Sequence, residues 1–219
     1  MQQARALVAG MLALVAGPAL ALDVLPAEYG QAYVDAFAEA CVPGRLSYEA
    51  SRETALAAGW AEVERNDHPE LAAVMQKSDE MLEADPEFDA DLVGVLMARD
   101  VAGTRHHLSL TEMTFVVEEG DDPWVMVGCH LYNFDATSPI DPAPVTALLE
   151  KPISHGIDQD GLVGHVWGPA CAMPRTGDTY LSYVTDGSTT FEATGFSGLS
   201  LNFSTSTPDE GEEVPETYC

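Results

Sequence analysis

The fold is decided by Trp124-Val-Met-Val-Gly-Cys-His-Leu-Tyr-Asn-Phe-Asp135, a long β-like run with a cysteine at its centre. Side chains alternate between the two faces of a strand. One face of this run therefore carries Val125, Val127, Cys129 and Leu131, and the other carries Trp124, Met126, Gly128, His130, Tyr132 and Phe134. Both faces are largely apolar, which is typical of an interior strand in a sheet covered on each side. The run predicts the central strand of the fold.

The chain is strongly acidic, with nine Lys and Arg against 36 Asp and Glu and a formal net charge of -27. Nucleic acids and anionic membranes are bound mainly through Lys and Arg, so we expect neither as a partner. A basic protein partner or weakly bound cations remain open. The length of 219 residues and the hydrophobic fraction of 46% indicate one globular domain.

The N-terminus predicts export. Residues 1–21 carry Arg5, then an apolar run from Ala6 to Val15, and end in Ala19-Leu20-Ala21, the pattern of a cleaved signal peptide. No later apolar run is long enough to span a bilayer, so we expect no membrane insertion. The mature chain is expected to be periplasmic or extracellular, with one domain over residues 22–207 and an acidic tail over 208–219.

Export predicts that the four cysteines form disulfides, because thiols in an oxidising compartment are usually oxidised. They are Cys41, Cys129, Cys171 and Cys219. Three pairings are possible, and we favour Cys41 with Cys129 and Cys171 with Cys219. The four residues are far apart and no C-x-x-C is present, which favours disulfides over metal or redox chemistry.

Helical signals dominate the first part of the mature chain. Residues 27–42 carry apolar side chains every four positions, and residues 47–58 end at Gly59, a residue typical of helix C-termini. A third helix is expected from Asp67 to about residue 85, with Asp67 as its cap and Glu70 reaching back to it. The residues expected on one face of the third helix are Leu71, Val74, Met75, Ser78 and Leu82.

Strand signals dominate the remainder. Besides the central strand, we expect strands at 92–98, 104–117, 162–167, 179–185, 189–193 and 199–204, with a short helix at 145–150. Asp186-Gly187 predicts a hairpin turn between two of them. The fold class is therefore α+β, with N-terminal helices packed on a mostly antiparallel, disulfide-stapled sheet of about five to seven strands.

Three histidines are the weak candidates for a binding site: His106, His130 and His165. His106 and His107 are neighbours on a strand and face opposite ways, so only one of them can join a given site. If the strands pair, one of these two could meet His130 and His165 beside a carboxylate, as a zinc or copper site requires. No H-E-x-x-H spacing supports this. Asp158-Gln-Asp160-Gly161 is expected to be a polar turn, because the further ligands of a calcium loop are missing.

No arrangement of residues predicts a catalytic site or a cofactor. Gly195-Phe-Ser197-Gly198 lacks the spacing of a nucleophile elbow, and phosphate-binding glycine loops are absent. We therefore expect an exported, non-enzymatic binding or accessory protein. The alternative hypothesis is a secreted hydrolase, with or without a metal, built from His106, His130 or His165 and acidic neighbours.

Overall fold

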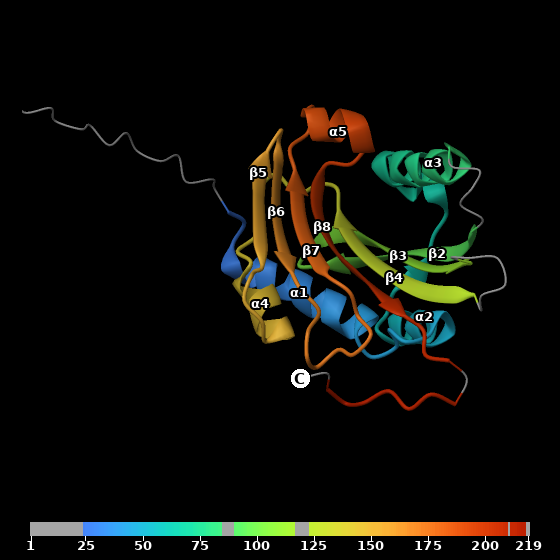
Figure 1. Cartoon of the computed structure of the whole chain (residues 1–219). Coiled ribbons are helices and arrows are strands. Elements are labelled where there is room, and N and C mark those ends of the chain that lie inside the picture. The colour runs from blue at the N-terminus through green and yellow to red at the C-terminus, as the bar shows by residue number, and fades with distance from the viewer. Residues whose placement is uncertain (1–23, 85–89, 117–122, 210, 218–219) are drawn as a thin grey trace, which may run out of the picture.

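The molecule consists of an eight-stranded antiparallel sheet with helices on both faces (Figure 1). The computed structural model describes residues 24–84, 90–116, 123–209 and 211–217, so the expected signal peptide lies outside the described residues. The strand order is β1-β2-β3-β4-β8-β7-β6-β5. The predicted central strand, β4, pairs with β3 on one side and with β8 on the other.

The strands are β1 (Ala61–Glu62), β2 (Ala90–Val101), β3 (Thr104–Phe115), β4 (Trp124–Asn133), β5 (His155–Gln159), β6 (Leu162–Trp167), β7 (Thr179–Val184) and β8 (Gly198–Ser206). The helices are α1 (Ala27–Cys41), α2 (Tyr48–Ala57), the short 3-10 turn η1 (Arg65–Asp67), α3 (Pro69–Ala84), α4 (Ala143–Leu149) and α5 (Thr189–Thr194). Among the described residues, no helix is long and apolar enough to cross a bilayer.

The first face of the sheet is covered by α1, α2 and α4 and holds the main core. The apolar stripe predicted for α1 is buried there, with Tyr33 and Phe37 fully inaccessible to solvent. The predicted disulfide between Cys41 and Cys129 is confirmed, with the two sulfur atoms 2.06 Å apart. It joins the last residue of α1 to the middle of β4. The pairing of Cys171 with Cys219 stays a prediction, because Cys219 lies outside the described residues.

The second face is covered by α3 and α5 and holds a smaller aromatic cluster. Leu71 of α3 packs there against Tyr132 of β4, against Phe134, which follows β4, and against Phe196, which precedes β8. Tyr132 and Phe134 stack on each other, and Phe196 meets both rings edge-on. The first turns of α3 are therefore fixed to the sheet by large side chains.

The capping predicted for α3 is wrong in its partners. His68, not Asp67, accepts a hydrogen bond on Nδ1 from the Glu70 amide. Glu70 does not reach back along its own helix; its carboxylate accepts the Ser197 amide at 2.6 Å and the Ser197 hydroxyl at 3.0 Å. The contact with Ser197 is favoured over a capping box because it provides the Glu70 carboxylate with two hydrogen-bond donors in one place.

The α+β class is confirmed, but the sheet has eight strands and not five to seven. Two strands carry little apolar signal: β1 has two residues, both exposed, and β5 is mostly exposed along its five. The strand predicted over 189–193 is the helix α5, because the Ser188 hydroxyl accepts the Phe191 amide as an N-cap. The expected polar turn at Asp160-Gly161 is a two-residue hairpin with positive φ at both positions.

Candidate functional site

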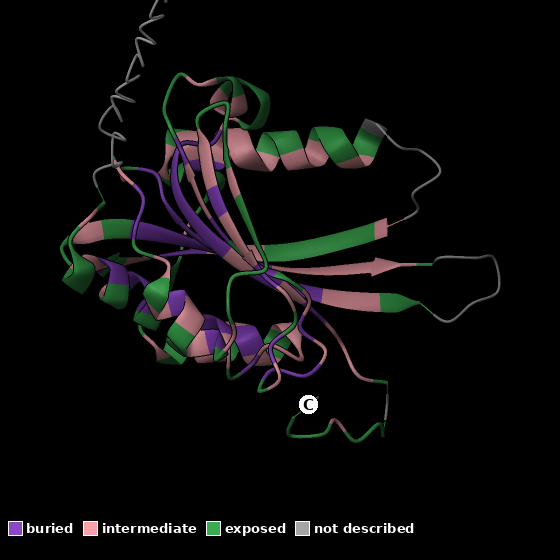
Figure 2. Cartoon of the chain, turned by 60° about the vertical axis from the view of Figure 1, so that its left-hand side comes forward, coloured by how far each residue is buried: buried purple, intermediate pink, exposed green. Residues whose placement is uncertain are grey.

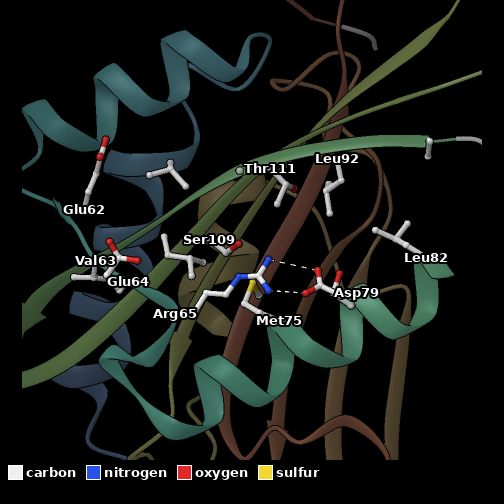
Figure 3. Close-up of a pocket in the computed structure, with 15 residues that line it drawn as sticks. Glu62, Val63, Glu64, Arg65, Met75, Asp79, Leu82, Leu92, Ser109 and Thr111 are labelled. Carbon is white, nitrogen blue, oxygen red and sulfur yellow. Dashed lines mark hydrogen bonds and ion pairs between the residues drawn. The ribbon is translucent and has the colours of Figure 1, made fainter.

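A groove separates the later turns of α3 from the second face of the sheet (Figure 3). It consists of an outer cavity of about 600 Å³ and an inner cavity of about 300 Å³. The two adjoin, since they share the lining residues Met75, Ser78, Leu82, Leu92, Ser109 and Thr111. The α3 face predicted from the sequence is thus correct, and three of its five residues line both cavities.

The groove exists because the sheet changes from large to small side chains beneath α3. Under the first turns the sheet presents aromatic rings, which fill the space against Leu71. Farther along, the helix faces small side chains of neighbouring strands, which cannot reach it: Gly94, Ser109, Thr111, Gly128 and Ser204. Figure 2 shows this part of the fold, where α3 runs above β2, β3 and β4 as they project from the buried centre.

Among the described residues that line the two cavities, Asp, Glu, Lys and Arg side chains occur at the outer cavity and not at the inner one. Arg65 of η1 pairs with Asp79 of α3, with Nη1 and Oδ2 2.5 Å apart, as Figure 3 shows. Glu62, which is paired with Arg52, and Glu64 also line this end. All four residues of the two ion pairs are partly exposed, so we assign the pairs little stabilising energy.

The inner cavity is lined by apolar side chains and a few neutral polar ones. Met75, Met113 and Met126 supply flexible thioethers from a helix and two strands, a side chain that adapts to irregular ligands. The polar side chains at or near its floor are Ser109, Thr111, His130 and Ser204. Such a lining, mostly apolar with a few polar groups, is typical of small-molecule sites.

His130 is the one predicted candidate that lies in the groove. Its ring is parallel to that of Tyr132, with centroids 6.2 Å apart, and its residue is half-buried with an edge toward the inner cavity. Burial lowers the pKa of His130 to about 4. The imidazole is therefore neutral near neutral pH and can donate or accept a hydrogen bond.

His106 lies on the opposite face of the sheet, beneath α1. Its Nδ1 donates to the Thr104 carbonyl at 2.8 Å, and its Nε2 accepts from the Tyr29 hydroxyl at 2.9 Å. Asn133 donates to the same hydroxyl. Burial lowers the pKa of His106, so this network is neutral and its groups are satisfied. It is a structural network.

His165 lies far along the sheet from the groove, on β6. It pairs across strands with Gly156 and Leu181, and its ring contacts that of Trp167 at a centroid distance of 6.1 Å. The structure therefore does not bring His106, His130 and His165 together. Within the described residues, no three His, Cys, Asp or Glu side chains are placed to hold a metal ion. The hydrolase hypothesis gains no support from a shared site of these histidines.

A second polar cluster joins η1 to β3 beside the aromatic cluster. Asp67 accepts two hydrogen bonds from Arg105, at 2.9 and 3.0 Å, and one from His107 Nε2 at 2.9 Å. These contacts, that with Arg105 first, lower the pKa of Asp67. His68 stacks on Phe134 with centroids 4.6 Å apart. The cluster fixes the chain that leads into α3, and so helps to set the position of the helix above the groove.

Sequence reasoning missed most residues of the groove. His107, Ser109 and Thr111 share one face of β3 because side chains alternate along a strand, but nothing in the sequence showed that a cavity lies over this face. The available signal was the pair of glycines Gly94 and Gly128, because a glycine inside a strand often marks a close approach or a space for a ligand. A search against protein-family models, curated proteins and solved structures finds no match to this chain.

Proposed function

We propose that this chain is an exported binding protein that holds a small, elongated and mainly apolar molecule in the groove beneath α3. The observation that carries the proposal is the pair of adjoining cavities of about 600 and 300 Å³. Their sizes match the range of about 300–1,000 Å³ that is usual for small-molecule sites. Methionine and leucine side chains would enclose the apolar part of the ligand.

The position of α3 supports reversible access to the groove. Its first turns are anchored through Leu71 and Glu70, whereas Ser78 and Leu82, in its later turns, line the cavity. A helix held at one end can adjust its other end to the ligand with little loss of packing. This arrangement suits binding and release of small molecules.

The N-terminal sequence supports export, with an apolar run from Ala6 to Val15 followed by Ala19-Leu20-Ala21. The disulfide between Cys41 and Cys129 agrees with an oxidising compartment. Periplasmic or extracellular localisation is therefore part of the proposal. Detection of the chain outside the cytoplasm, with residues 1–21 removed, is its direct test.

Binding is tested by titrating the mature protein with N-phenylnaphthylamine, an uncharged apolar dye whose emission rises in apolar surroundings. We expect saturable binding with one site per chain. Ser78→Phe places a ring in the groove, because Ser78 lines both cavities, and should weaken dye binding about tenfold or more, a loss of about 1.4 kcal/mol.

The matched control is Met81→Phe on the same helix, because the Met81 side chain is 74% exposed. This variant should bind the dye like the original protein. Thermal melting of both variants checks that each is folded. Equal dye affinity in folded Ser78→Phe and in Met81→Phe would refute binding in the groove.

A further inference from the structure

Polar side chains of the inner cavity have no hydrogen-bond partner within the described part of the protein. They include Ser109, Thr111, His130 and Ser204 of the sheet, and none of these four is sealed from solvent. The network beneath α1 is different, because Tyr29, His106 and Asn133 there bond to one another or to the backbone. Polar groups in protein interiors are normally paired. Unpaired groups that line an open cavity are available to a ligand.

Two of these groups lie close together beside Gly128 on β4. A Cβ atom at Gly128 would lie 2.6 Å from Thr111 Oγ1 and 3.4 Å from His130 Nε2. A Cβ atom this close to Thr111 Oγ1 would clash, so glycine at position 128 allows the Thr111 hydroxyl to lie against β4 beside the His130 imidazole. Both side chains line the same inner cavity. Each of these two groups can donate or accept a hydrogen bond.

The inner cavity also indicates the charge of that ligand group. Among its described lining residues there is no Asp, Glu, Lys or Arg. A carboxylate or ammonium group placed there would lose its hydration and gain no opposite charge, at a large cost in free energy. Burial keeps His130 neutral near neutral pH, since it lowers the pKa to about 4. A neutral polar group avoids this penalty.

We propose that the part of the inner cavity bordered by Thr111 and His130 is the subsite for an uncharged head group, a hydroxyl or a carbonyl, of an amphiphile whose apolar part lies along the methionine-lined groove. The inference rests on the proposed binding function and specifies its ligand class. Thr111 and His130 are its specificity-determining residues, and Gly128 allows their polar groups to lie side by side.

The test compares decanol with decanoate, which share an alkyl chain but differ in head-group charge, as competitors for bound N-phenylnaphthylamine at neutral pH. We expect decanol to displace the dye at a concentration at least about tenfold lower, a difference of about 1.4 kcal/mol. The preference should persist in about 1 M NaCl, where the Debye length falls to about 3 Å and general repulsion by the acidic surface is screened.

Thr111→Val tests head-group recognition separately from binding in the groove, because valine keeps the shape of threonine and removes its hydroxyl. Loss of one hydrogen bond should weaken decanol binding about three- to tenfold more than it changes the binding of dye or decanoate. Thr114→Val is the matched control, since Thr114 lies on the same strand but on the other face. It should leave all three affinities unchanged.

The possible results distinguish this inference from the proposed function. Failure of the dye to bind would overturn both. Dye binding that Ser78→Phe weakens, with decanoate as effective as decanol in high salt, would overturn the head-group subsite and leave groove binding intact. An unchanged decanol affinity in Thr111→Val would do the same.

Discussion

Cys129 and His130 are neighbours on β4 whose side chains lie on opposite faces of the sheet. Cys129 is joined to Cys41 beneath α1, whereas His130 lines the groove beneath α3. The same strand therefore fastens the main core with one side chain and presents a polar group to the candidate site with the next. This division allows stability and binding to be tested separately.

The disulfide should contribute to stability more than to binding. The bond closes a long loop, because its cysteines are 88 residues apart. Replacing Cys41 and Cys129 by serine should lower the free energy of unfolding by about 2–5 kcal/mol. Urea denaturation measures this change. The dye affinity of the folded double variant should stay within about twofold, because the bond and the groove lie on opposite faces of the sheet.

The contact between Glu70 and Ser197 should hold the first turn of α3 against the start of β8. Glu70→Ala leaves the Ser197 amide and hydroxyl without their acceptor and should lower the free energy of unfolding by about 1–3 kcal/mol. Hydrogen exchange should rise at the first turns of α3. Glu83→Ala, which alters an exposed carboxylate on the same helix, should change neither quantity. Equal effects of the two substitutions would show that the contact does not anchor the helix.

Stability should fall in mild acid, partly through His130. Its pKa is about 4 in the folded chain, whereas a histidine in an unfolded chain has a pKa of about 6.5. Between these pH values the unfolded chain binds a proton that the folded chain does not. The free energy of unfolding should decrease as the pH falls from 6.5 to about 4, by about 3 kcal/mol from this residue. Burial lowers the pKa of His106, His107 and His165 as well, so these residues also make the free energy of unfolding decrease as the pH falls.

Urea denaturation across this pH range checks the prediction. His130→Gln should remove part of the slope, because glutamine does not titrate. His155→Gln, at an exposed position of the edge strand β5, is the control and should keep the slope of the original protein. A slope that His130→Gln leaves unchanged would show that His130 is not buried in its neutral form.

The sequence predicted the parts of the fold that depend on local periodicity. The stripe of α1, the α3 face and the alternation along β4 all follow from spacing. The pairing of Cys41 with Cys129 was favoured among three possible pairings, and the structure confirms it. Short elements escaped this reasoning, because β1 and β5 bury few side chains and Ser188 turns a β-rich run into the helix α5.

The groove could not be predicted in the same way, because it depends on which strands become neighbours. Ser204 reaches the site only because β8 pairs with β4, with Ser204 beside Gly128. Thr111 meets Gly128 from the other side, through the pairing of β3 with β4. These small residues are far apart in the chain, and only the register of the sheet gathers them under α3.

The methionine methyl groups offer the most direct test of binding beneath α3. The chain beyond residue 21 has six methionines, of which Met75, Met113 and Met126 line the groove. Met97 and Met173 are buried elsewhere, and Met81 is exposed on the outer side of α3. In a methyl NMR titration of methionine-labelled mature protein with decanol, we predict shifts at the three groove methionines and none at the other three. Shifts at Met81, Met97 or Met173 with none at Met75, Met113 and Met126 would contradict a ligand site in the groove.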